Sequence, residues 1–131
     1  MIKKFIIHTQ KEGLHDITSN VVNVVNESKI TDGIVVVFSP HTSAAITITE
    51  NSDPHVLTDL IFALNKISPE LKEFNHNELN SHAHVKSSLI GASELLIIQH
   101  GQVILGTWQG IYFCEFDGPR TRTYYVKIIG N

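Results

Sequence analysis

Three of the eight histidines of the chain lie close together, at positions 76, 82 and 84, in a polar segment that also holds Glu78. The residues before this segment show little helical or strand periodicity, so it is predicted to begin in a loop. Imidazole is the commonest side-chain ligand of transition metals and the usual general acid or base near neutral pH. The segment therefore indicates a functional surface, and a solvated loop that happens to contain histidine is the ordinary alternative.

The spacing of these histidines decides which of them can share a ligand. An extended segment would place His82 and His84 on one side, whereas a helix would turn them about 160° apart. Because Ala83 and His84 lead into a helical pattern, His76 with His84 is the better pair, joined by a loop that can fold back. With His41 they would supply three nitrogen donors and leave a fourth position open, as in catalytic zinc sites. The spacing alone is not diagnostic of a metal.

His41 lies at a break between two strong strand patterns and is followed by Thr42 and Ser43. At such a break the backbone amides are free of the ladder, and with the imidazole and two hydroxyls they would cradle an anion or oxyanion. A strand-end loop with polar caps explains the same residues equally well.

Glu50 and Asn51 end a predicted strand directly before a helix that begins with proline. Glu50 would serve as a general base or would orient a metal-bound histidine, unless it is only a strand-end charge in solvent. Further along, Gln109 and the single tryptophan, Trp108, lie between two glycines. Gln109 is a candidate hydrogen-bond partner for a substrate, and Trp108 a core or subunit contact.

Arg120 and Arg122 follow a turn and would lie on the same side of the next strand. Paired guanidinium groups suit a phosphate or a carboxylate ligand. They suit a surface salt-bridge network just as well.

The elements that must position these residues are strands and helices in mixed order. Asp53 as N-cap and Pro54 at the first helical position predict a helix that ends before Pro69. Another helix is expected to run to Ser28 with Asp16 as its N-cap, and a short one over 85–90 with Gly91 as its stop. Strands are expected over 3–10, 34–38, 44–49, 95–98, 103–105, 110–116 and 124–129. The order predicts an α+β domain dominated by antiparallel sheet.

Size and composition narrow the class of protein. The 131 residues predict one domain, residues 1–131, with no apolar run of the roughly 20 residues that a membrane span requires. The N-terminus is too short of apolar residues for a signal peptide, so a soluble cytoplasmic protein is expected. A net charge of −3 with scattered lysines and arginines argues against nucleic-acid binding. Cys114 is the only cysteine, which leaves no disulfide, and a buried position is expected for it.

Taken in order, these motifs resemble the YjbQ-type family, whose members carry the label of secondary thiamine-phosphate synthases. The resemblance covers nearly the whole chain and is specific when its segments are taken together. It implies a compact α+β, sandwich-like antiparallel fold with two to three helices, a homotrimer, and sites near subunit boundaries. It also implies that His41, His76 and His84 are the family positions and that His82 is not. The matching segments are His41–Ala44, Glu50–Pro54, Asp59, His76, His84–Gly91, Leu105–Gly110, Arg120 and Arg122.

The expected function is therefore that of a small trimeric enzyme acting on a phosphorylated metabolite, with no nucleic-acid or membrane partner. If the label holds, it is a transferase that joins a pyrimidine diphosphate to a thiazole phosphate and releases diphosphate. A divalent ion, zinc by ligand type, would be held by His41, His76 and His84. A non-catalytic protein that binds a phosphorylated or carboxylated metabolite is the alternative, and purely structural histidines are a third. The expected catalytic residues are Glu50, His41 and Gln109, and the expected substrate-binding residues are Thr42, Ser43, Asn51, Arg120 and Arg122.

Overall fold

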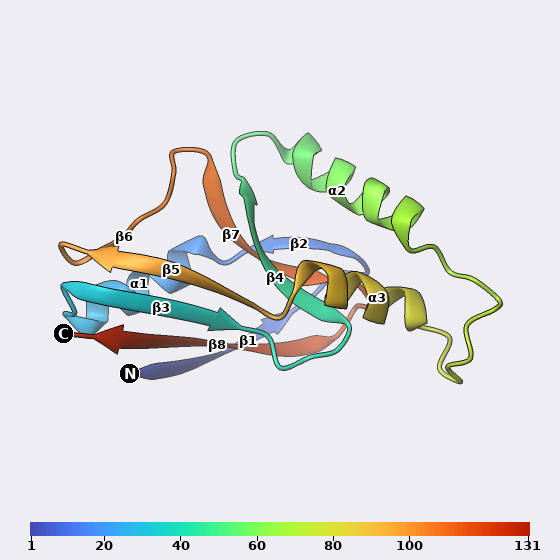
Figure 1. Cartoon of the computed structure of the whole chain (residues 1–131), viewed down its shortest axis with the longest axis horizontal. Coiled ribbons are helices and arrows are strands. Elements are labelled where there is room, and N and C mark those ends of the chain that lie inside the picture. The colour runs from blue at the N-terminus through green and yellow to red at the C-terminus, as the bar shows by residue number, and fades with distance from the viewer.

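The computed structural model describes residues 1–131 and contains eight strands and three helices. Their order and arrangement can be followed in Figure 1. The elements are β1 (Ile2–His8), β2 (Gly13–Asp16), α1 (Thr18–Ser28), β3 (Asp32–Phe38), β4 (Ala44–Glu50), α2 (Pro54–Ile67), α3 (Ser81–Ile90), β5 (Ser93–Gln99), β6 (Gln102–Val103), β7 (Gln109–Glu115) and β8 (Thr121–Gly130).

The strands form two antiparallel sheets, so the predicted α+β class with antiparallel sheet and up to three helices is confirmed. The larger sheet has the order β1-β8-β3-β5-β6, and the smaller one the order β2-β7-β4. Helices α2 and α3 lie together on one side of the molecule, beside β4 (Figure 1).

The main core lies between the two sheets and is closed by α1. β3 carries a run of β-branched residues, of which Val35 and Val37 point into this core and are fully buried. Three valines of α1, at helical spacing, pack against them. Because this packing compensates for the low intrinsic helix propensity of β-branched residues, α1 is stable here. Those valines are Val21, Val24 and Val25.

The smaller sheet is covered on both faces. Along β4 and β7, Ile46 and Phe113 belong to the main core, whereas their neighbours Ala45 and Cys114 belong to a second apolar cluster with Leu64 of α2. Successive side chains of a strand point to opposite faces, so one strand serves both clusters. This sheet therefore holds α2 and α3 against the rest of the domain.

The outer face of the larger sheet has no covering layer within one chain. Large apolar side chains on β1, β3, β5 and β8 stay exposed on it, although each strand turns its alternate residues into the main core. We call this surface the outer apolar face. Its exposed large apolar members include Ile2, Ile6, Phe38, Leu95, Ile97 and Ile129.

The helix boundaries agree with the sequence where the signals are local. Asp53 caps α2 by accepting a hydrogen bond from the His55 amide at 2.9 Å, with Pro54 as first helical residue, as predicted. For α1, the N-cap is Ile17, one residue later than predicted. The Asp16 carboxylate still accepts from the Thr18 amide at 2.9 Å.

Two elements differ from the sequence prediction. β2 was not predicted, because its four residues carry no periodicity of their own and it exists only through pairing with β7. α3 begins at Ser81, four residues earlier than expected, so that it includes both His82 and His84. Its hydrophobic residues do not follow a helical stripe, and the sequence pattern therefore concealed its first turn.

Candidate functional site

His84 lies in the first half of α3, where the helix rests on the start of β4. Its Nδ1 atom lies 2.8 Å from the carbonyl oxygen of Thr42, so Nδ1 carries the proton and donates to that oxygen. About one helical turn later, the Ser87 hydroxyl donates a hydrogen bond to the carbonyl oxygen of Ala44 at 2.6 Å. These two contacts fix α3 on β4 and leave Nε2 of His84 with an unshared electron pair.

His76 reaches the same place from the loop before α3. The His76 and His84 ring centroids lie 5.3 Å apart with the rings inclined at 66°. The Nε2 atom of His76 is 3.8 Å from the carboxylate of Glu78, and its side chain is 42% exposed. The loop thus folds back and pairs these two histidines. His82 does not join them: it lies elsewhere on α3, and its buried Nδ1 has no hydrogen-bond partner in the chain.

His41 is held in the loop between β3 and β4. Its Nε2 accepts the backbone N–H of Thr123 at 2.9 Å, and its own backbone N–H donates to the Ser39 hydroxyl at 3.4 Å. Burial and the nearby Arg122 guanidinium lower the pKa of His41, which favours the neutral ring. With Nε2 acting as acceptor, Nδ1 carries the proton. In this conformation neither nitrogen of His41 offers a lone pair to a metal ion.

A single chain does not assemble the predicted three-histidine set. No group of three or more His, Cys, Asp or Glu side chains in the chain is arranged to hold a metal ion. His76 and His84 do lie together. His84 also has the arrangement common in metal sites, in which the nitrogen that does not face the metal donates to a carbonyl. One chain therefore brings two of the three predicted ligands close together.

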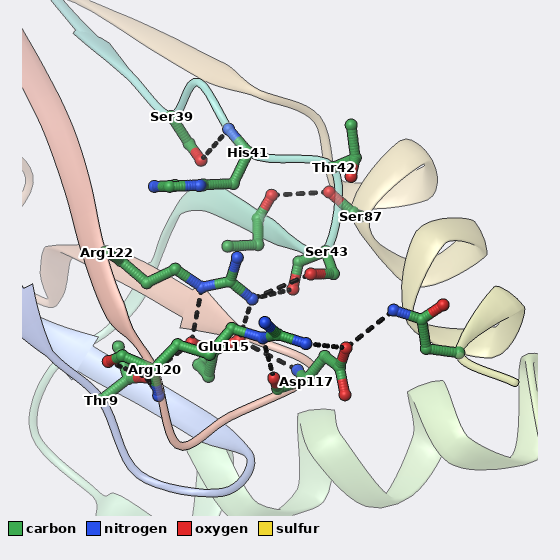
Figure 2. A network of polar contacts seen from close by, with 12 residues as sticks. Thr9, Ser39, His41, Thr42, Ser43, Ser87, Glu115, Asp117, Arg120 and Arg122 are labelled. Atoms are coloured by element: carbon green, nitrogen blue, oxygen red, sulfur yellow. Dashed lines mark hydrogen bonds and ion pairs between the residues drawn. The ribbon is translucent and has the colours of Figure 1, made fainter. Parts of the chain in front are cut away.

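A buried ion pair lies beside His41 and connects the two sheets. Arg122 of β8 donates from Nε and Nη2 to the two carboxylate oxygens of Glu115 on β7, at 2.8 and 2.6 Å. The Thr9 hydroxyl and the Asp117 amide donate to the same carboxylate, at 2.6 and 2.9 Å. Burial by itself raises the pKa of Glu115, but these hydrogen bonds outweigh it and hold that pKa below its usual value. Figure 2 shows His41 on one side of the guanidinium and Glu115 on the other.

The same network occupies most of the residues predicted to bind phosphate. Arg122 also donates to the Ser43 hydroxyl at 2.8 Å, so both are committed within the protein. Arg120 donates from Nη2 to the Asp117 carboxylate at 2.9 Å and from Nε to the carbonyl of Asp117 at 2.7 Å. Both arginines form salt bridges, but the pair of Arg122 with Glu115 is buried, and only that of Arg120 with Asp117 lies at the surface, as the alternative interpretation expected for both. Each arginine keeps its Nη1 without a hydrogen-bond partner in the chain, but Arg122 is buried whereas Arg120 is half exposed.

Glu50, Asn51 and Gln109 lie at the opposite end of β4. The Asn51 side-chain amide donates to the Gln109 carbonyl at 3.0 Å, and the Gln109 side-chain oxygen accepts from the Gly106 amide at 2.7 Å. Glu50 borders a cavity of about 200 Å³ on this side. The seven strand residues between Ser43 and this end span roughly 23 Å. One small substrate therefore cannot touch both ends of β4 within one chain.

Two buried charged residues of the structure were not identified from the sequence. Glu115 lies in an apolar run and is fully buried, and Lys86 on α3 is 1% exposed. Lys86 donates to Glu12 at 2.7 Å and also to the side-chain oxygen of Asn65. The available signal was a charged residue at an inward-facing position of a strand or helix, which requires a partner. For Glu115 that partner is Arg122, which lies on the same inward face of β8 as the buried Tyr124 and Val126.

Comparison with known proteins finds matches to a single protein family. The family model described as UPF0047 protein YjbQ-like matches residues 3–131. A UPF0047 protein of Methanocaldococcus jannaschii is 53% identical over 100% of this chain and 96% of its own length. The UPF0047 protein YugU of Bacillus subtilis is 48% identical over 99% of this chain and its whole length.

Solved structures show the same fold. A crystal structure of a protein of the yjbq/upf0047 family from Clostridium acetobutylicum has a TM-score of 0.95 at 50% identity, covering 97% of this chain and 99% of that one. A YbjQ-like protein of unknown function from Sulfolobus solfataricus has a TM-score of 0.96 at 30% identity, covering 100% of this chain and 97% of that one. None of the three helices has the length and apolar character needed to cross a membrane.

Proposed function

Because the chain belongs to the UPF0047 family of YjbQ-like proteins, we propose that it is a small cytoplasmic enzyme acting on a phosphorylated metabolite at the surface formed by His84, His76 and His41. The observation that carries this proposal is the orientation of His84. Its Nδ1–H is committed to the Thr42 carbonyl, and its Nε2 is unused beside a second imidazole.

In this proposal His76 and His84 hold a divalent ion, with zinc favoured by imidazole ligands. When bound, such an ion would offset the charge of a phosphate or diphosphate group. The other ligands would be water, an oxygen of the substrate, or a histidine of a neighbouring copy. His41 would become a ligand only by giving up the Thr123 amide.

The chain's own residues supply the remaining interactions. His41 presents Nδ1–H as a fixed hydrogen-bond donor, and its lowered pKa keeps it a donor without adding a charge. The exposed Thr42 and the free Nη1 of Arg120 are further donors for an anionic oxygen. Donors fixed before the reaction stabilise charge that develops on a leaving group. The finer proposal is a transferase of the thiamine-phosphate synthase type, in which a carbon–nitrogen bond forms as diphosphate leaves.

We propose that the enzyme is a homotrimer and that the outer apolar face supports assembly. Leu95 and Ile97 on β5 are 57% and 54% exposed, and a surface of this kind on one chain marks an interaction site. In an assembly, Glu50, Asn51 and Gln109 would take part in catalysis if a neighbouring copy brings them to the histidines. A double Leu95→Asp, Ile97→Asp variant should reduce the mass measured by light scattering. Phe62→Asp on α2, at a side chain 65% exposed, is the control and should leave the mass unchanged.

The metal assignment is tested on protein purified without a histidine tag. Metal analysis should find close to one zinc ion per chain, which is lost in His76→Asn and His84→Asn and kept in His41→Asn. Retention in the first two variants would overturn the assignment. Loss from His41→Asn would show instead that Nε2 leaves the Thr123 amide and completes the three-histidine set.

Turnover separates an enzyme from a binding protein. Pyrimidine diphosphate and thiazole phosphate are incubated with the zinc-loaded protein, and diphosphate release is measured. Product formation that is lost in Glu50→Gln while phosphate-ester binding survives supports the enzyme. Binding without turnover of these or other phosphorylated substrates supports the non-catalytic alternative.

A further inference from the structure

Helix α3 turns two polar residues inward beside Ala83 and leaves two apolar residues exposed, which departs from the usual pattern. It buries Lys86 and Ser87, which are 1% and 7% exposed, and leaves Val85 and Leu89 38% and 58% exposed. The buried polar pair is satisfied internally, through Glu12 and the carbonyl of Ala44. A helix of a globular domain normally turns its apolar residues inward. The outward apolar residues of α3 therefore form a surface with no partner inside the chain.

These apolar residues line a cavity that also includes His84. The cavity has a volume of about 470 Å³ and is bordered by Phe74, Ser81, His84, Val85, Ser88 and Leu89. Residues 84, 85, 88 and 89 are spaced so that they follow one side of the helix. The size lies within the range of small-molecule sites, roughly 300–1,000 Å³.

The cavity combines two chemistries. At His84 it has an imidazole whose Nε2 is unused, with His76 5.3 Å away between ring centroids. Along the helix it has the apolar surfaces of Val85, Leu89 and Phe74. A ligand that matches both parts needs a polar anionic head and an apolar body. Free inorganic phosphate would match only the first part.

We propose that the ligand of this site is a small phosphate monoester whose apolar body of about four to six carbon atoms lies along α3, on Val85, Leu89 and Phe74. The position of its head at His84 and His76 rests on the proposed function, while the contact of its body with α3 stands on the cavity alone. A second copy of the chain is the other possible occupant. The outer apolar face, which lies on the larger sheet, is the wider apolar surface for that role.

The experiment uses the full chain with carbon-13 labels in its valine and leucine methyl groups. Methyl, butyl and hexyl phosphate are titrated against zinc-free and zinc-loaded protein, and methyl chemical shifts are followed by NMR. Five added methylene groups, half covered in an open cavity, should tighten binding by about thirty-fold. The methyl signals of Val85 and Leu89 should shift with hexyl phosphate and much less with methyl phosphate.

Variants separate the head from the body. Leu89→Ser should remove most of the gain with chain length and leave the affinity for methyl phosphate unchanged. Phe62→Ser, which removes a similarly exposed apolar side chain on α2, is the matched control and should keep the whole gain. His84→Asn should weaken all three esters by a similar factor.

Equal affinities for the three esters in both forms of the protein would overturn the proposal. A fall in the mass of the assembly in Leu89→Ser would also overturn it, because a second copy would then occupy the cavity. Failure of the proposed function gives a different result: zinc is not retained, but the zinc-free protein still prefers hexyl phosphate. If zinc is retained through His84 but affinity does not depend on the chain length of the ester, the metal site is supported and the apolar contact with α3 is refuted.

Discussion

Replacing Glu115 by glutamine tests the buried ion pair beside the candidate site. The substitution preserves the size of the side chain and removes its charge. Arg122, 6% exposed, is then left with a buried positive charge and without its hydrogen-bonded carboxylate. Each carboxylate oxygen now accepts two hydrogen bonds, one from Arg122 and one from Thr9 or the Asp117 amide. An amide nitrogen in either position cannot accept, so two of these four bonds are lost.

The expected cost follows from these contacts. Removing one partner of a buried pair destabilises a protein by about 3–5 kcal/mol, because the other charge stays buried and uncompensated. The lost hydrogen bonds are part of this figure and are not added to it. We therefore expect Glu115→Gln to lower the free energy of unfolding by about 4 kcal/mol. That is a large share of the roughly 5–15 kcal/mol typical of a domain.

The measurement is urea denaturation followed by circular dichroism, with all variants at the same protein concentration because assembly would add to stability. The control is Glu27→Gln. Glu27 is 57% exposed and 3.5 Å from Lys3, and its loss should cost less than about 1 kcal/mol. A cost below about 1 kcal/mol for Glu115→Gln as well would refute the reasoning, since it would mean that Arg122 is solvated in solution.

The ion pair also predicts how stability depends on pH. In the folded protein, burial raises the pKa of Glu115. The hydrogen bonds from Arg122, Thr9 and the Asp117 amide outweigh this effect and hold the pKa below its usual value. Its contribution is therefore complete above the ordinary glutamate pKa and is lost as the pH falls through the folded value. The gap in unfolding free energy between the natural protein and Glu115→Gln should narrow below about pH 4. A gap that widens on acidification would contradict the assignment.

Three further predictions concern single residues. Burial raises the pKa of Cys114 to about 12. Iodoacetamide at about pH 8 should therefore leave Cys114 unmodified in the folded chain and label it in urea. Labelling of the folded chain would show that the thiol is accessible. Asp53→Ala removes the cap on the His55 amide and should cost about 1 kcal/mol in urea denaturation, and no change would mean that another group replaces the cap. Nitrogen-15 NMR should find His41 neutral with its proton on Nδ1 at neutral pH; a proton on Nε2 would rule out the Thr123 hydrogen bond.

The fold was predictable where the signal is local. The β-branched run of β3 and the Asp53–Pro54 start of α2 each lie within a few residues and needed no knowledge of the rest of the chain. β2 was missed because its conformation comes from β7, about a hundred residues away in the sequence. The early start of α3 was missed because the polar Lys86 and Ser87 lie inward and the apolar Val85 and Leu89 lie outward, which removes the usual periodicity.

The candidate site divides in the same way. The pairing of His76 with His84, and the exclusion of His82, followed from spacing and from the expected helix. The state of His41 did not, because the amide that it accepts belongs to Thr123, 82 residues later. Glu50 and Gln109 were predicted to be catalytic together with His41, but the length of β4 keeps them apart from it within one chain.

By itself, the sequence determined the family, the α+β class and the residue types that can do chemistry, because these depend on composition, motif order and short-range periodicity. Only the tertiary structure decided which of those residues are free to act. It commits Arg122 to Glu115 and Ser43, turns Nε2 of His41 to a backbone amide, and leaves Nε2 of His84 open. The physical reason is that a polar group entering the interior must find a partner there. The pairing register of the strands supplies that partner from a residue far away in the sequence. A local sequence pattern therefore does not predict it.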